Sequence, residues 1–172
     1  MTENSKDLEH LAALASAAKP TGQRPPPVDK GHFGISIDVD GMWSHGGTTF
    51  PRLALAKLFA TVLKRDESGA YWLETPVERG RIDVADAPFV AVEMQAGGIG
   101  TAQEIRFRTN LDAWAPLDDA HRLRIELNPE TDEPRPYIRV RDRLEARLLR
   151  PAFYDLADLA VDDPTGKVLG VW

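Results

Sequence analysis

The sequence predicts an α+β protein built from two small subdomains with antiparallel sheets. From residue 76 onward most segments alternate apolar and polar residues, and this period of two is typical of strands with one buried face. Residues 51–65 and 151–161 instead carry apolar side chains at helical spacing. No helical pattern separates the middle strands, which favours antiparallel pairing over a parallel βαβ sheet.

The first 33 residues are expected to form an N-terminal extension. Leu8, Leu11 and Leu14 recur every third residue, so residues 5–18 are expected to form a short amphipathic helix. Residues 19–27 contain four Pro and one Gly, a composition that excludes helix and central strand and predicts an extended linker. The predicted division is therefore an extension at 1–33, an α+β subdomain at 34–76 and a mainly-β subdomain with a late helix at 77–172.

The first subdomain is predicted to open with a hairpin. Residues 35–39 alternate like a half-buried strand, Asp40-Gly41 is a strong turn signal, and residues 42–45 form the returning strand. The helix at 51–65 follows, then a turn at 66–69 and a strand at 71–73. In the second subdomain the expected strands lie at 82–84, 89–94, 105–107, 123–127, 138–140 and 144–148, before the helix at 151–161 and a last strand at 168–172.

The two ends of this region repeat one order of elements. Each reads strand, tight turn, strand, Pro, helix, Asp-x-x-Gly and strand, with the Pro at Pro51 and Pro151. This order predicts a duplicated hairpin-helix-strand unit. The alternative is that two common hairpin-helix arrangements occur independently.

Several sequence blocks resemble a bacterial domain-of-unknown-function family, family 1285. The blocks are Asp40-Gly41-x-Trp43-x-His45, Tyr71 to Glu78, Asp86 to Val90, Arg108-Thr109-Asn110, Pro136 to Arg141, Leu144 to Leu148, and Gly170-Val171-Trp172. The resemblance covers residues 32–172. It implies a duplicated core whose C-terminal half resembles pleckstrin-homology folds, a site for a nucleotide-like ligand between the halves, and a role in signal transduction. It brings no catalytic activity. Arg143 departs from the family, which tends to have Gly there.

The positive charges suggest an anionic ligand. Net charge is −6, yet ten of the fifteen Arg lie between Arg106 and Arg150, where no Lys occurs. Arg binds carboxylates and phosphates through two parallel bonds, which Lys cannot do. Ten acidic residues lie from Glu104 to Glu145, so cross-strand ion pairs on an exposed sheet face are the alternative. The candidate ligand-binding residues are Trp43, His45, Thr75, Glu78, Arg106, Arg108, Arg139 and Arg141.

Catalysis has one candidate motif. Asp38-Val39-Asp40-Gly41 resembles the first motif of haloacid-dehalogenase phosphatases, in which two aspartates act with magnesium. That motif follows a parallel strand, whereas this segment is fully explained as a hairpin turn. We therefore expect a non-enzymatic ligand-binding module without cofactor or metal; the alternatives are a magnesium-dependent phosphatase using Asp38 and Asp40, or a scaffold that binds a protein partner.

The compartment follows from what the sequence lacks. There is no Cys, which excludes disulfides, thiolate zinc sites and a Cys nucleophile. No signal peptide or run of about 20 apolar residues is evident. These features predict a cytoplasmic protein, with no strong case for polymeric nucleic acid as a partner.

Overall fold

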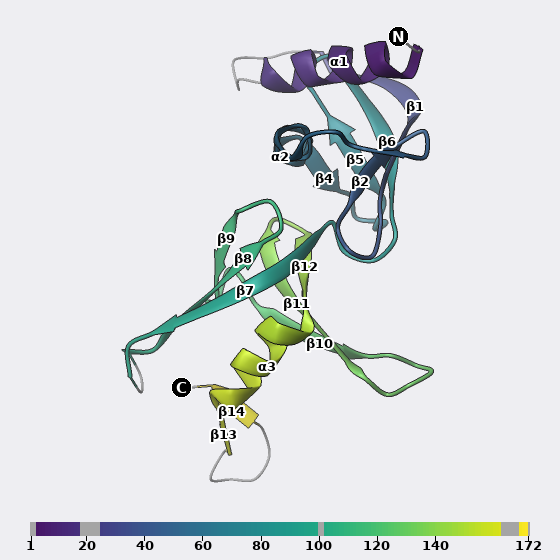
Figure 1. Cartoon of the computed structure of the whole chain (residues 1–172). Helices are drawn as coiled ribbons and strands as arrows, with labels where there is room; N and C mark the ends of the chain where they lie inside the picture. The colour runs from purple at the N-terminus through teal and green to yellow at the C-terminus, as the bar shows by residue number, and fades with distance from the viewer. Residues whose placement is uncertain (1–2, 18–24, 100–101, 163–168, 172) are drawn as a thin grey trace. The chain divides into compact units, whose positions relative to one another are not determined.

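The structure, a computed structural model, describes residues 3–17, 25–99, 102–162 and 169–171. Two units make up the chain, Met1–Asp86 and Ala87–Trp172. The described residues form three helices, two six-stranded sheets and one two-stranded sheet, as Figure 1 shows. The predicted α+β class is therefore confirmed.

The first unit combines two helices with one sheet. Its elements are α1 (Glu3–Ser16), β1 (Val28–Ile37), β2 (Trp43–His45), β3 (Thr48–Thr49), α2 (Leu53–Thr61), β4 (Leu63–Arg65), β5 (Tyr71–Glu74) and β6 (Glu78–Val84). The sheet has the order β3-β2-β1-β6-β5-β4. Because β6 lies between β1 and β5, the first unit extends through Asp86, whereas the boundary suggested by the sequence, at residue 76, precedes β6.

The core of the first unit lies where the helices meet the sheet. Phe59 of α2 and Ile35, Trp43 and Leu73 of the strands are 2% exposed or less. Helix α1 contacts α2, and its Leu11 is buried at 4% exposure. The apolar spacing of residues 5–18 thus produces a helix, as predicted, and that helix docks on the first unit.

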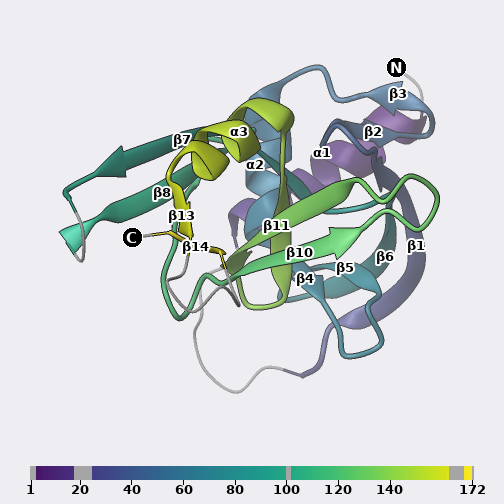
Figure 2. The same cartoon turned by 90° about the horizontal axis from the view of Figure 1, so that it is seen from below.

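The second unit carries a curled sheet and one helix. Its elements are β7 (Phe89–Gly97), β8 (Glu104–Thr109), β9 (Trp114–Pro116), β10 (Leu123–Leu127), β11 (Pro134–Arg141), β12 (Leu144–Leu148), α3 (Arg150–Asp158), β13 (Ala160–Asp162) and β14 (Leu169–Val171). The sheet order is β10-β11-β12-β7-β8-β9, and β13 pairs with β14. Helix α3 lies beside β7 (Figure 2), burying Ala152 and Leu156 against a core that includes Phe107 and Ile138.

Both six-stranded sheets are mixed, so the prediction of purely antiparallel sheets is wrong. In the first unit β1 pairs parallel with β6, for example Ile37 with Val84. In the second unit β12 pairs parallel with β7, for example Leu148 with Ala91. The other pairs in these sheets are antiparallel. Local alternation predicts a strand but not the direction of a partner that lies far along the chain.

The helix expected at 51–65 is shorter than predicted. α2 ends at Thr61, and residues 63–65 form β4, which pairs with β5. Leu63 is fully buried in that strand, so an apolar residue that continues the helical spacing serves the sheet instead. Helix α3, expected at 151–161, likewise ends early, at Asp158. Residues 160–162 form β13, which pairs with β14. Strand β9 was not expected, and β11 begins at Pro134, before the strand expected at 138–140.

The repeated order of elements is present in the structure. In each unit a hairpin is followed by a nine-residue helix and a second short hairpin. The second hairpin joins the large sheet in the first unit but forms a separate sheet in the second. Superposition of the two copies stays a prediction. No helix within the described part of the chain has the length and apolar character needed to cross a membrane.

Candidate ligand-binding site

The residues predicted from the sequence fall into separate places. Trp43 and His45 lie on β2, Thr75 and Glu78 at the β5–β6 turn, Arg106 and Arg108 on β8, and Arg139 and Arg141 on β11. The first four belong to the first unit and the four arginines to the second.

Trp43 is a core residue of the first unit. Its side chain is 2% exposed, and its ring centroid lies 5.8 Å from Phe50 and 6.4 Å from Phe59. Its indole Nε1 is buried and has no hydrogen-bond partner in the structure. His45, two residues along the same strand, is 7% exposed and borders a small hollow beside α1. Aromatic burial explains Trp43, whereas His45 faces space that a ligand could enter.

Thr75 and Glu78 hold the turn between β5 and β6. The Thr75 hydroxyl donates to the Glu78 carbonyl at 2.9 Å and accepts from the amides of Val77 and Glu78 at 3.3 and 3.1 Å. The Glu78 carboxylate, with a 9% exposed side chain, lies 3.7 Å from His10 Nε2 of α1 and 3.8 Å from Lys30 Nζ of β1. These contacts give both residues a structural role in joining elements of the first unit.

The four candidate arginines do not form one continuous row across neighbouring strands. Strands β8 and β11 are separated in the sheet by β7 and β12, so Arg106 and Arg108 lie apart from Arg139 and Arg141. Arg139 is exposed, and its side chain has no hydrogen bond or ion pair among the described residues. Arg141 lies 3.8 Å from the Asp142 carboxylate, and burial lowers the pKa of its guanidinium.

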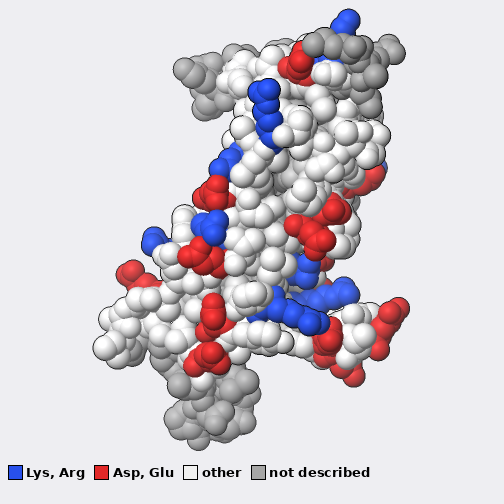
Figure 3. Space-filling view, viewed as in Figure 1, with Lys and Arg blue, Asp and Glu red and all other residues white. Residues whose placement is uncertain are grey.

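Acidic side chains neutralise several arginines of the second unit. Arg108 Nε donates to Glu93 at 2.7 Å and its Nη1 donates to Asp112 at 3.1 Å; the bond to the Glu93 carboxylate raises the pKa of Arg108 most. Arg124 donates to Glu145 at 2.7 Å and contacts Glu126. Figure 3 shows acidic and basic side chains interspersed on the visible face of this unit. Such pairing matches the structural interpretation of the Arg-rich region.

Arg106 differs from these arginines because its acceptor is neutral. Its Nε and Nη2 donate to the Gln95 side-chain oxygen at 3.1 and 2.7 Å. Its guanidinium carbon lies 4.6 Å from the centre of the Trp114 ring. A cation–π contact holds a guanidinium without removing its charge. Arg106 therefore presents a positioned positive charge.

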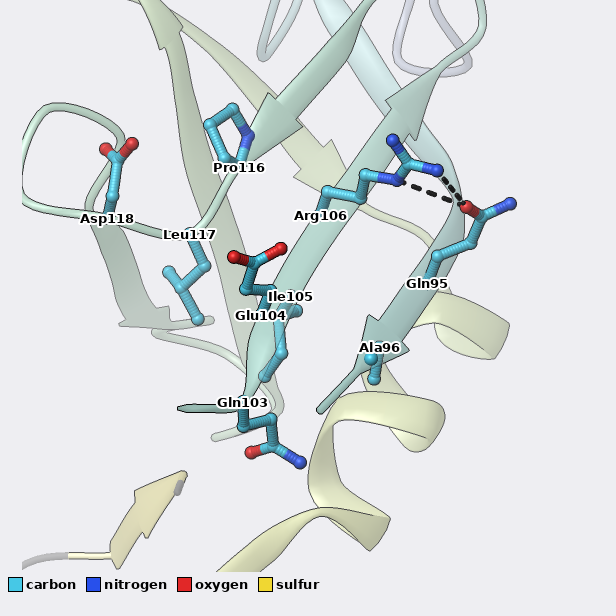
Figure 4. Close-up of a pocket in the computed structure, with 10 residues that line it drawn as sticks. Gln95, Ala96, Gln103, Glu104, Ile105, Arg106, Pro116, Leu117 and Asp118 are labelled. Carbon is cyan, nitrogen blue, oxygen red and sulfur yellow. Dashed lines mark hydrogen bonds between the residues drawn. The ribbon is translucent and has the colours of Figure 1, made fainter. Parts of the chain in front are cut away.

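A pocket of about 610 Å³ lies beside Arg106 in the second unit. Its lining includes Gln95, Gln103, Glu104, Ile105, Arg106 and Asp118, which come from β7, β8 and the segments next to β8 and β9. Figure 4 shows Arg106, hydrogen-bonded to Gln95, at one end of the pocket. Gln103 lies at the other end (Figure 4). Small-molecule sites commonly have volumes of roughly 300–1,000 Å³. The pocket is therefore large enough for a ligand of metabolite size.

The polar groups of the pocket differ in how well they are satisfied. The side-chain oxygen of Gln103 is buried and has no hydrogen-bond partner among the residues that the structure describes. Glu104 makes no hydrogen bond or ion pair through its side chain among the described residues. Asp118 instead accepts bonds from the His121 ring and from the amides of Ala120 and His121, and the His121 ring bond lowers its pKa most. Gln103 and Glu104 are thus the acceptors available to a ligand.

Sequence reasoning identified Arg106 but missed the rest of this pocket. Gln95, Gln103 and Asp118 become neighbours only because β7, β8 and β9 pair in register. The one local signal was the pair of glutamines on either side of the Gly97-Gly98 tip. No residue spacing along the chain marks a pocket built from three paired strands.

Asp38 and Asp40 form the predicted turn. The Asp38 carboxylate accepts hydrogen bonds from the amides of Asp40 and Met42, both at 2.9 Å, and Gly41 has a φ of 79°. Asp38 follows β1, which does pair parallel with β6, so the strand direction argued above against a phosphatase motif is not the distinguishing feature. The distinguishing feature is the pair of hydrogen bonds, because the Asp38 carboxylate uses them to cap its own turn. Among the described residues no three His, Asp or Glu side chains group as metal ligands would.

Comparison with known proteins agrees with the two-unit division. Residues 20–87 match the "Domain of unknown function (DUF1285), N-terminal domain", and residues 88–172 match the "Protein of unknown function (DUF1285), C-terminal domain". No curated protein matches the sequence.

Two solved structures are similar over most of the chain. A DUF1285 family protein from Silicibacter pomeroyi DSS-3 is 38% identical with a TM-score of 0.81, covering 94% of this chain and 89% of that one. A DUF1285 family protein from Shewanella baltica OS155 is 25% identical with a TM-score of 0.57, covering 73% of this chain and 91% of that one. With both domain models matched in order, the chain belongs to the DUF1285 family.

Proposed function

We propose that this protein is a non-catalytic module that binds a small anionic, nucleotide-like ligand in the pocket beside Arg106. The observation that carries the proposal is the state of Arg106, whose guanidinium is positioned by Trp114 and bonded only to a neutral amide. A phosphate or carboxylate can replace Gln95 as acceptor and form two parallel bonds with the guanidinium, which adds the attraction between opposite charges that the neutral amide does not provide.

The remaining polar groups favour a ligand that also carries N–H donors. Glu104 and the unsatisfied Gln103 oxygen accept hydrogen bonds, so they complement amino and imino groups such as those on a nucleobase edge. A buried acceptor without a partner costs free energy that a donor on the ligand would recover. A nucleoside monophosphate combines one anionic group with such donors.

Binding rather than catalysis fits the side chains that line the pocket. Among the described residues the lining includes no Ser, Thr, Cys, Lys or His, and the Asp118 carboxylate is held by its own turn. A module that binds a metabolite without converting it is suited to the signalling role that the sequence resemblance implies. The expectation that the ligand lies where the two halves of the chain meet stays a prediction.

Thermal unfolding with nucleotides tests the proposal. The probes are the four ribonucleoside monophosphates, the matching nucleosides, and inorganic phosphate. A ligand at 100 times its Kd adds about 2.7 kcal/mol of stability, which for a chain of this size raises Tm on the order of 5–10 °C. We expect at least one monophosphate to exceed both its nucleoside and phosphate, because only the monophosphate reaches the cation and the acceptors together.

Variants distinguish binding in this pocket from a nonspecific effect of positive charge on the protein surface. Arg106→Gln should remove the shift, and Gln103→Ala should reduce it. Arg135→Gln removes the same charge from an exposed arginine outside the pocket, and it should leave the shift intact. Arg139→Gln tests the other arginine group chosen from the sequence. The proposal fails if no monophosphate raises Tm, or if the shift depends on Arg139 and not on Arg106.

A further inference from the structure

A second hollow, of about 190 Å³, lies in the first unit next to His45. Its walls are Ser5 and Leu8 of α1, His45 of β2, Thr48 and Thr49 of β3, and Phe50 and Pro51. A neighbouring hollow of about 280 Å³ shares Ser5, Leu8 and Pro51 with it. Its other lining residues are the apolar Ala12 and Leu55 and the charged Glu9 and Arg52. At roughly 30 Å³ per water molecule, the space beside His45 holds about six waters.

His45 forms part of the wall of this hollow, and its ring has no partner among the described side chains. The residue is 7% exposed, and its ring makes no hydrogen bond or ion pair with any residue that the structure describes. Its nitrogens are not among the fully buried, unpartnered atoms of the described residues, so they are accessible from the hollow that His45 borders. The neutral imidazole ring carries one N–H donor and one acceptor nitrogen, so two hydrogen-bonding positions are open there.

The other walls define the chemistry that this space accepts. No charged side chain lines the hollow next to His45. Ser5, Thr48 and Thr49 provide hydroxyl groups that make no side-chain hydrogen bond among the described residues, while Leu8, Phe50 and Pro51 provide apolar surface. A charged ligand would find no opposite charge in these walls, whereas a small uncharged molecule would find both polar and apolar complements.

We propose that the hollow beside His45 is a separate binding site for a small uncharged molecule with a carboxamide-like head and a short hydrocarbon body. The head provides an acceptor for the imidazole N–H and a donor for its other nitrogen. The body packs against Leu8 and Pro51 and extends toward Leu55 in the neighbouring hollow. The site is independent of the pocket beside Arg106, because its lining residues all belong to the first unit.

The position of α1 gives this binding a consequence. Ser5 and Leu8 belong to α1, while the other walls belong to the sheet and the segment before α2. A bound molecule therefore adds contacts between α1 and the remainder of the first unit. Occupancy stabilises the docked helix and slows hydrogen exchange of its amides.

Titration by NMR of the full chain at pH 8 tests the site. The probes are butyramide and valeramide, with butyrate and valerate as charged molecules of matching shape. We expect saturable shifts at the amides of Thr48, Thr49 and Ser5 with the carboxamides, slower exchange in α1, and at least tenfold weaker binding of the carboxylates. Absence of saturable shifts, shifts confined to the second unit, or tighter binding of the carboxylates would overturn the proposal.

His45→Phe tests the role of the ring nitrogens without emptying the site. It keeps an aromatic ring and removes two polar atoms that make no hydrogen bond to a described residue, so the free protein should keep a similar Tm. Carboxamide affinity should fall at least tenfold. His32→Phe makes the same change on an exposed position of β1 outside the hollow, and it should leave affinity unchanged. Equal binding by His45→Phe and the unaltered chain would refute the proposal.

Discussion

Trp43 provides a direct test of whether a conspicuous aromatic residue supports the core or contacts a ligand. In the structure it is 2% exposed and lies between Phe50 and Phe59, so it joins β2 to α2. Trp43→Ala removes roughly 150–200 Å² of buried apolar area. At about 25 cal/mol per Å² this corresponds to about 4–5 kcal/mol, which agrees with the roughly 3–5 kcal/mol typical of truncating a buried aromatic.

Urea unfolding followed by far-UV circular dichroism and by the amide signals of the first unit measures this loss. The midpoint should fall while the m value is unchanged, because the folded state buries the same chain. Trp114→Ala is the comparison: Trp114 is 38% exposed on an edge strand of the second unit, so its truncation removes less buried area and should cost less, roughly 2–3 kcal/mol by the same estimate, without shifting the amide signals of the first unit. A loss below about 1 kcal/mol for Trp43→Ala would refute the assignment of Trp43 to the core.

Two further predictions concern turns. The pKa of Asp66 is lowered to about 2, mainly by the hydrogen bond from Ser68 and next by the hydrogen bond from the Trp72 indole. The contribution of Asp66 to stability is therefore present above its unfolded pKa near 4, and it is lost as pH falls through about 2. Asp66→Asn should therefore flatten the decline in Tm between pH 4 and pH 2, and Trp72→Phe should flatten it partly; an unchanged decline in Asp66→Asn would contradict this account. At the β11–β12 turn the left-handed residue is Asp142, with a φ of 46°. Asp142→Gly should raise the free energy of unfolding by about 0.5–1 kcal/mol because glycine adopts that φ without steric cost. Arg143→Gly should not raise it. The reverse result in urea unfolding would show that the positive φ of the turn lies at Arg143 and not at Asp142.

Family resemblance and structure agree on the turn at 142–143 only in part. The sequence marked Arg143 as the departure from the family because Gly is usual there. The structure instead places the positive φ on Asp142, which tolerates the left-handed region better than most residues. A local comparison of residue types therefore found the right turn but not the strained position within it.

The candidate pocket shows why the sequence left several arginines as equal candidates for a binding site. Arg106 was chosen because it belongs to an Arg-rich region, but so were Arg108 and Arg141, which are respectively paired with acids and partly buried. Which arginine keeps an available charge depends on its neighbours across the sheet. Those neighbours, Glu93 for Arg108 and Gln95 for Arg106, are set by the register of β7 and β8.

The sequence by itself determined the α+β class, the presence of a helix near the N-terminus, the turn at Asp40-Gly41, and the hairpin-helix order found in both units, whereas the docking of that helix on α2 came only from the structure. These features arise from contacts between residues close in the chain, so the periods of two and 3.6 and the turn residues report them directly. Tertiary structure decided the parallel pairs β1–β6 and β12–β7, the strand at Leu63, and which charges are neutralised. Those outcomes depend on partners distant in sequence, and local periodicity carries no information about which distant strand a segment will pair with or in which direction.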